Sequence, residues 1–361
     1  MAFIELASFI IKNSFSIITG IFGIGFIIAF HEFGHFIFGK LFGVNIPSFS
    51  IGFGPKLLTT KIGSTDFSIS AVPLGGYVEA EVGNYNNPQP GTIAGIAYWK
   101  KMTIIGGGIL FNLIFAYAVF VGLSLTGIPG NPFYTKGGVH AIEKVEPNSA
   151  AQQHGIIAGD KITAINGTNT KNDLRALLTI VKNIPNQKAE ITVERDGKEY
   201  NIYAVIGSKT VKGKEIGSLG AQFSFAQTPP VDFRTALQQA FEMTVSLIKS
   251  TANGFLGALT KRSTDGLAGP LMMISMTAQT ASHSVKLFLL LLGLISVSLA
   301  VLNLIPLPIL DGGQAVTYTI EAIRQKPLSE QTLEYVHYTC WLLMLTLFVY
   351  LTFKDVIAMW F

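Results

Sequence analysis

The chain has 361 residues, of which 49% are hydrophobic and only 13% are charged, and its formal net charge is +4. An ordinary soluble domain carries about 25% charged residues, so this composition indicates a membrane protein with some water-exposed mass. The small net charge gives no reason to expect a nucleic-acid partner, and the single cysteine, Cys340, excludes a disulfide framework.

Four segments are long and apolar enough, at about 20 residues, to span a bilayer. They are Phe15–Phe38, Met102–Leu125, Val285–Leu307 and Val336–Phe353. No small-residue cleavage site follows the first segment, so we expect a retained span and not a signal peptide.

The stretch between the first two spans, residues 39–101, has strand character. Lys56–Ile62 and Thr65–Val72 flank the turn Gly63-Ser64, and this pattern predicts a β-hairpin. An exposed edge of such a hairpin can pair with an extended peptide through main-chain hydrogen bonds. We therefore take Phe67, Ser68, Ile69 and Ser70 as candidate substrate-binding residues.

Residues from about Gly137 to Gly207 have the composition of a soluble domain, which we assign to residues 127–210. Two helices are predicted, at Asn148–His154 and Leu174–Val181. Strands are predicted at Val139–Val145, Ala189–Arg195 and Tyr200–Ile206, the last two joined by the hairpin signal Asp196-Gly197, and the segment Gly159–Gly167 is predicted to be a turn, a strand and another turn. A strand-rich sandwich with two helices follows.

The segment from Pro229 to about Ser282 has apolar residues at helical spacing, interrupted by charged ones. This pattern predicts amphipathic helices, which would lie on the membrane surface or against the spans; packing against the small soluble domain is the alternative. The sequence thus divides into seven predicted segments: the first span (1–38), the β-region (39–101), the second span (102–126), the small domain (127–210), the amphipathic helical region (211–284), the third span with Asp311 (285–313), and the second loop with the fourth span (314–361).

Basic residues are concentrated in the two short loops, which indicates that both loops are cytoplasmic. They are Lys40, Lys56, Lys61, Lys100 and Lys101 in the first loop, and Arg324 and Lys326 in the second. Both termini and the small domain would then be extracytoplasmic.

The first span contains three ionisable side chains between Ser14 and Phe38, namely His31, Glu32 and His35. Polar groups in hydrocarbon are costly and usually functional. On a helix, His31 and His35 lie one turn apart on one face and can bind one Zn²⁺, with Glu32 as the general base toward water.

A catalytic zinc site usually has three protein ligands, and Asp311 is the candidate for the third. It follows span three, which runs from outside to inside, so it reaches the same leaflet as the two histidines. Pro306 and Pro308 break the helix before it and free the backbone to turn. A plain turn at the membrane surface is the alternative for Asp311-Gly312-Gly313.

Two asparagines lie inside predicted spans, and either could hydrogen-bond to a neighbouring helix. Asn303, close to Asp311 in the chain, is the better candidate for a functional role than Asn112. The remaining histidines have no metal-like spacing.

These motifs together resemble the site-2 protease family of zinc intramembrane proteases, in particular the bacterial regulator-of-sigma-E proteases. The resemblance rests on His31–His35, Phe49–Pro55, Pro73–Val78 and Asn303–Gly313. In the middle domain, Gly159–Ile162 and Ile165–Gly167 resemble elements of a bacterial PDZ domain.

The resemblance implies a polytopic α-helical membrane protein with four transmembrane helices, a cytoplasmic-side membrane-associated β-region and one extracytoplasmic PDZ domain. It implies zinc ligands His31, His35 and Asp311, a catalytic Glu32, and substrate or transition-state contact by Asn303. Expected substrates are single-span proteins already shortened by another protease, such as anti-sigma factors and remnant signal peptides. The expected location is the bacterial cytoplasmic (inner) membrane.

Two departures from the family pattern stand out. Many members carry two PDZ domains, whereas this chain has room for one. The second span usually opens with a Gly-Pro pair before its asparagine, whereas this chain has Gly107-Gly108, a change expected to alter the helix geometry there with no obvious effect on the zinc.

Two other functions are alternatives to the protease. A membrane scaffold that binds peptides through its PDZ domain, with a non-catalytic zinc site, would have no need of Glu32. A metal transporter would carry more polar residues in its second and fourth spans.

Overall fold

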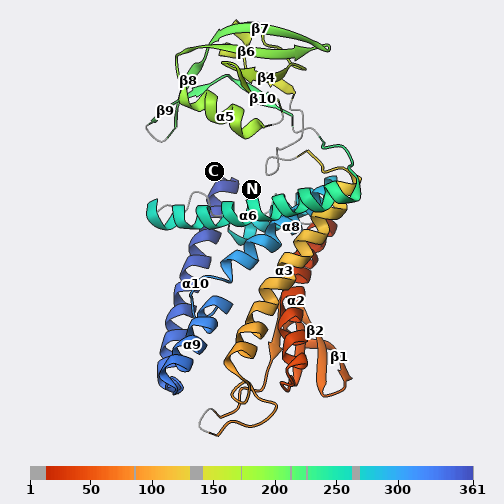
Figure 1. Ribbon diagram of the computed structural model, residues 1–361, viewed down its shortest axis with the longest axis vertical. Coiled ribbons are helices and arrows are strands. Elements are labelled where there is room, and N and C mark those ends of the chain that lie inside the picture. The colour runs from red at the N-terminus through yellow and green to blue at the C-terminus, as the bar shows by residue number, and fades with distance from the viewer. Residues whose placement is uncertain are drawn as a thin grey trace. The chain divides into compact units, whose positions relative to one another are not determined.

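The computed structural model describes residues 14–84, 87–130, 141–171, 173–211, 214–224, 227–261 and 269–360. The chain forms two compact units (Figure 1). Residues 1–121 and 237–361 make up the first, here called the helical unit. Residues 122–236 make up the second, here called the small unit.

Within the described residues, four helices are long and apolar enough to cross a membrane, and they coincide with the four segments predicted to be spans. They are α2 (Ser14–Leu41), α3 (Tyr98–Thr126), α8 (Val285–Leu302) and α10 (Glu330–Trp360). Helix α8 ends at Leu302, earlier than the predicted Leu307, because Pro306 and Pro308 cannot donate helical hydrogen bonds.

Helices α2 and α3 approach each other closely through glycines. A Cβ atom on Gly34 of α2 would collide with the backbone carbonyl of Gly107 in α3, and the reverse collision also holds. Phenylalanines on both sides of this contact pack edge to face or tilted, including Phe30 with Phe111. Without a driving force from water, small residues and such packing hold membrane helices together.

The predicted amphipathic region contains two helices, α6 (Phe233–Lys261) and α7 (Pro270–His283). Helix α7 packs against α2, where the buried Thr277 lies beside Gly20. The buried carboxylate of Asp355 in α10 accepts hydrogen bonds from the Gly269 and Met272 amides and so caps the first turn of α7. The short helix α9 (Asp311–Arg324) follows α8.

The β-hairpin between α2 and α3 consists of β1 (Ser48–Ile62) and β2 (Thr65–Glu79). Each strand bends, so that each pairs with two stretches of the other. Ser48–Ile51 faces Asp66–Ile69 on one side and Gly76–Glu79 on the other, while Asp66–Ile69 also pairs with Leu58–Lys61. The hairpin is as predicted, but Phe67, Ser68 and Ile69 have strand partners on both sides and offer no free edge.

The small unit has the predicted strand-rich build with two helices. Its strands are β3 (Ile142–Val145), β4 (Lys161–Ile165), β5 (Thr168–Asn169), β6 (Lys188–Arg195), β7 (Lys198–Val205), β8 (Gly207–Val211), β9 (Lys214–Ser218) and β10 (Ala221–Phe223). Its helices are α4 (Ala150–Gln153) and α5 (Leu174–Asn183). The predicted strand Val139–Val145 begins outside the described residues.

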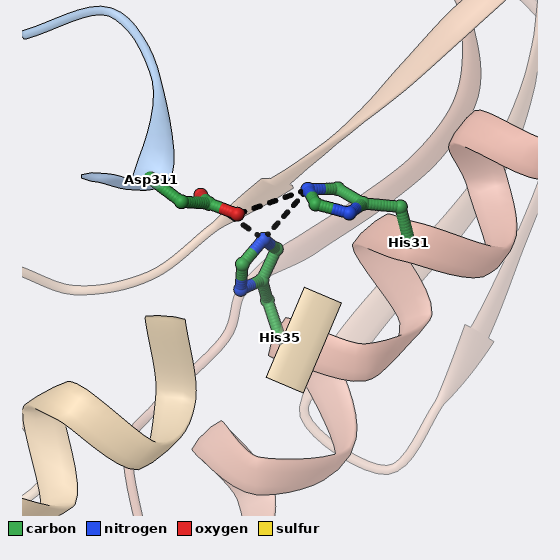
Figure 2. A group of neighbouring side chains, drawn as sticks. All are labelled: His31, His35 and Asp311. Carbon is green, nitrogen blue, oxygen red and sulfur yellow. Dashed lines mark hydrogen bonds and ion pairs between the residues drawn. The ribbon is translucent and has the colours of Figure 1, made fainter. Parts of the chain in front are cut away.

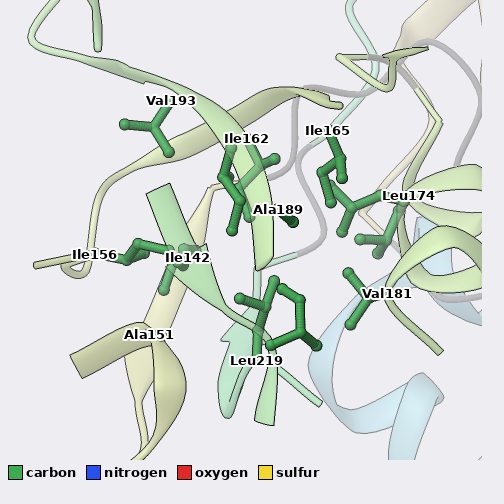
Figure 3. Close-up of a cluster of buried hydrophobic side chains, with 14 residues drawn as sticks. Ile142, Ala151, Ile156, Ile162, Ile165, Leu174, Val181, Ala189, Val193 and Leu219 are labelled. Carbon is green, nitrogen blue, oxygen red and sulfur yellow. The ribbon is translucent and has the colours of Figure 1, made fainter. Parts of the chain in front are cut away.

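One hydrophobic core holds the small unit together (Figure 3). It includes Ile165, Ile191 and Val193 from the sheet β5-β4-β6-β7 and Leu219 from the segment before β10. Strand β10 pairs with β3, so this unit continues beyond residue 210, where the sequence had suggested its end. In the segment predicted to be helical, 211–284, the described residues Lys214–Ser218 and Ala221–Phe223 are strands, and Leu219, Ala221 and Phe223 pack on this core.

Candidate metal centre

His31 and His35 point from one face of α2 toward the first residue of α9, Asp311 (Figure 2). The two Nε2 atoms lie 3.2 Å apart. Asp311 Oδ2 lies 3.2 Å from His31 Nε2, and Asp311 Oδ1 lies 3.4 Å from His35 Nε2. Three residues separated by up to 280 positions in the chain therefore meet at one point.

The segment between α8 and α9 brings Asp311 to the histidines. After Asn303 the chain turns back on itself, and the Gly312 amide donates a 2.6 Å hydrogen bond to the Asn303 carbonyl. A Cβ on Gly312 would collide with the Leu304 carbonyl, and one on Gly313 with the Leu307 carbonyl. Glycine at positions 312 and 313 is thus required for the chain to pack so closely.

The spacing of the three side chains fits a zinc ion. In a tetrahedral site with zinc–ligand bonds of about 2.0–2.1 Å, neighbouring ligand atoms lie about 3.3 Å apart. The two Nε2 atoms lie 3.2 Å apart, close to this value, and each lies at a similar distance from one oxygen of the Asp311 carboxylate, His31 from Oδ2 at 3.2 Å and His35 from Oδ1 at 3.4 Å. Asp311 Oδ2 is also buried without a hydrogen-bond donor, an arrangement that is costly unless a cation satisfies it. Within the described residues, this is the one group of His, Cys, Asp and Glu side chains found with metal-like geometry.

Helix α3 closes the other side of the group. Gly108 leaves no room for a side chain, because a Cβ there would collide with His35 Nε2 and lie 2.7 Å from His31 Cε1. Gly108 therefore lies directly against both histidines, a contact that the sequence did not indicate. Position 108 determines whether the two imidazole rings fit.

The outer nitrogen of each imidazole also has a partner on α3. His35 Nδ1 lies 2.8 Å from the Ile104 carbonyl, to which it can donate. His31 Nδ1 lies 3.1 Å from the side-chain amide of the fully buried Asn112. Sequence reasoning ranked Asn112 below Asn303, because a polar residue in a span can pair with any nearby helix and no local pattern marks this partner.

Glu32 lies beside His31, His35 and Asp311, and all four residues line a cavity of about 640 Å³. The Val78 amide, on the outer edge of β2, donates a hydrogen bond to its carboxylate. A Cβ built on Gly76 would lie in ordinary contact with the Glu32 side chain. The cavity is therefore bordered on one side by α2 and on another by the end of β2.

Asn303 also lines this cavity and is largely buried. The predicted substrate-binding residues Phe67, Ser68, Ile69 and Ser70 do not line it. Instead Phe67 packs against other phenylalanines, and Ser68 and Ser70 are buried in hydrogen bonds to hydroxyls of β1. The residues that β2 and its continuation contribute to the cavity are Gly75, Gly76, Val78, Ala80 and Val82.

Comparison with known proteins yields relatives along most of the chain. The pattern that describes peptidase family M50 matches residues 19–347. A protein of Campylobacter jejuni, whose name describes it as a candidate zinc metalloprotease, is 29% identical over 350 residues, covering 92% of this chain and 91% of its own. A protein of Agrobacterium fabrum with the same description is 31% identical, covering 90% and 91%. The chloroplastic membrane metalloprotease ARASP of Arabidopsis thaliana is 28% identical, covering 92% and 77%.

Proposed function

Because this chain belongs to peptidase family M50 and is a zinc metalloprotease, we propose that it hydrolyses peptide bonds within the transmembrane segments of other proteins. The observation that carries this proposal is that Asp311 meets His31 and His35 at distances a metal ion can bridge, beside Glu32, and that the two histidines and Glu32 lie on a helix apolar enough to span a membrane. A site-2 protease-type activity requires these groups at membrane depth.

In this proposal, His31 and His35 through Nε2, and Asp311 through its carboxylate, hold the zinc ion. When bound, zinc supplies Lewis acidity, which activates water and polarises the scissile carbonyl. Glu32 takes the proton of the attacking water and delivers it to the leaving amide nitrogen. Asn303, whose side chain lines the same cavity, donates a hydrogen bond to the oxygen of the scissile carbonyl.

The substrate needs an extended backbone, because the carbonyls of a helix are hydrogen-bonded and sheathed by side chains. We assign the pairing edge to Gly76–Glu79 and not to Phe67–Ser70. Ser48–Ile51 pairs with one side of Gly76–Glu79, and the other side borders the cavity. A substrate strand added there would pass beside Glu32.

The proposed substrates are single-span membrane proteins with a cytoplasmic N-terminus, already shortened by another protease, such as anti-sigma factors and remnant signal peptides. The small unit acts in this proposal as an extracytoplasmic PDZ domain. Basic residues in the two short loops support a cytoplasmic position for these loops and for the site, in a bacterial inner membrane.

The test is cleavage of a single-span substrate by the purified full chain, comparing wild type with Glu32→Gln and Asp311→Asn. Glu32→Gln should lower the cleavage rate by at least about 100-fold, as expected for loss of a general base, and should keep its zinc. Asp311→Asn should lower both cleavage and bound zinc, because it weakens a ligand.

Two results would contradict the proposal in different ways. If Glu32→Gln lost zinc while Asp311→Asn kept it, the assignment of ligand and base would be wrong. If wild type with zinc cleaved none of several trimmed substrates, the scaffold function with a non-catalytic zinc site would take its place.

A further inference from the structure

Asn112 is a buried polar residue in the middle of α3 whose side chain reaches the metal centre. It is fully buried, and its amide lies 3.1 Å from His31 Nδ1. Its backbone carbonyl accepts a 2.9 Å hydrogen bond from Ser296 of α8, while its side-chain oxygen has no donor. A buried amide oxygen without a donor costs about 1–3 kcal/mol.

The protonation of the His31 imidazole determines which hydrogen bond the Asn112 side-chain amide must make. When His31 Nε2 binds a metal ion, its proton must be on Nδ1, and Nδ1–H then needs an acceptor. The two ends of an asparagine amide are nearly indistinguishable by shape and are assigned from the hydrogen bonds around them. Rotating the side-chain amide of Asn112 by about 180° places its oxygen next to His31 Nδ1. The oxygen can then accept the hydrogen bond that His31 Nδ1–H donates, and it is no longer without a donor.

The second histidine shows the same arrangement with a different acceptor. His35 Nδ1 lies 2.8 Å from the Ile104 backbone carbonyl, which no substitution removes. Asn112 lies eight residues later on α3, so both acceptors come from one face of this helix. His31 thus depends on a side chain where His35 depends on the backbone.

We propose that Asn112 is a positioning residue of the metal centre, whose side-chain oxygen accepts the Nδ1–H of His31 and holds the ring with Nε2 toward the ion. This inference rests on the proposed zinc site. It gives Asn112 no contact with substrate or with the reacting atoms.

The experiment is the zinc affinity of the purified full chain, measured by competition with a chelator, for three variants. Asn112→Leu has a similar size but no acceptor, and should lose about 10–100-fold in affinity. Asn112→Asp keeps an acceptor at the same place and should restore the affinity to within about threefold. Ser296→Ala removes the hydrogen bond to the Asn112 backbone only, and should match wild type.

The thermal stability of the metal-free variants separates positioning from a general structural role. We expect similar metal-free stability for Asn112→Leu and Asn112→Asp, with different zinc affinity. If leucine prevents folding, Asn112→Ala takes its place in the comparison. Two results would overturn the role of Asn112: a wild-type zinc affinity in Asn112→Leu, or a loss of zinc affinity in Asn112→Asp as large as that in Asn112→Leu. Absence of tight zinc binding by wild type would instead overturn the metal site itself.

Discussion

Replacing Gly108 by alanine tests the geometry of the metal centre with a single methyl group. The added Cβ would lie 2.7 Å from His31 Cε1 and would collide with His35 Nε2. Carbon atoms in contact sit about 3.5–4.0 Å apart, so the rings must retreat by about 1 Å. A displacement of that size at a reacting centre costs about 100-fold in rate, or about 2.7 kcal/mol of transition-state stabilisation.

The same helix offers a matched control two residues earlier. Gly106 has open space where its Cβ would lie, and Gly106→Ala changes the helix composition in the same way. Because glycine is costly inside a helix, this control should stabilise the protein by about 0.5–1 kcal/mol and leave activity unchanged.

The assay is the cleavage rate of a single-span substrate together with the zinc content of each purified variant. We expect Gly108→Ala to lose about 100-fold in rate and to bind zinc more weakly, with Gly106→Ala equal to wild type in both. Wild-type rate and zinc affinity in Gly108→Ala would refute the reasoning, since the rings could then not occupy the positions described. Equal losses in both variants would show a general effect of alanine in α3 instead.

Two further predictions concern other parts of the molecule. One prediction uses single cysteines in a Cys340→Ala background. A cysteine at Val82, which lines the cavity, should form a disulfide with a cysteine-bearing substrate, whereas a cysteine at Thr59, on the opposite edge of the hairpin, should not. Equal cross-linking at both positions would contradict the assigned edge. In the small unit, burial by itself would raise the pKa of Asp160, but hydrogen bonds from Arg195 and a backbone amide outweigh it and hold that pKa below its usual value. Asp160→Asn should therefore cost about 1.5–3 kcal/mol at pH 7 by pulse proteolysis. In wild type, the contribution of ionised Asp160 to the free energy of unfolding should decrease as the pH falls below about 4 and should be lost once the pH is below the lowered pKa of Asp160. If Asp160→Asn were as stable as wild type at pH 7, this prediction would be wrong.

The spans and strands were predictable because their signals are local. Each apolar run of about 20 residues must form a helix in a bilayer, since its backbone groups have no other partners there. The alternation around Gly63-Ser64 and around Asp196-Gly197 likewise specified hairpins from neighbouring residues alone. The end of α8 was missed by five residues, because hydropathy continues to Leu307 although the prolines stop the helix earlier.

Pairings between distant segments could not be predicted in the same way. The sequence predicted an edge at Phe67–Ser70, but Ser48–Ile51 folds back and covers one side of most of it. Nothing in the alternating pattern distinguishes a strand with one partner from a strand with two. The same limitation applies to β10, which completes the small unit by pairing with a strand about 80 residues earlier.

The sequence by itself determined the membrane class, the two histidines one helical turn apart, and Glu32 between them, because helical periodicity places these groups without help from the rest of the chain. It also nominated Asp311 through the order and direction of the spans. Only the tertiary structure decided that Asp311 comes within 3.4 Å of both histidines, that Gly108 must lack a side chain, and that Asn112 meets His31. Those facts depend on how closely α2, α3 and the turn before α9 approach one another, and such distances are set by packing between helices, which no single segment encodes.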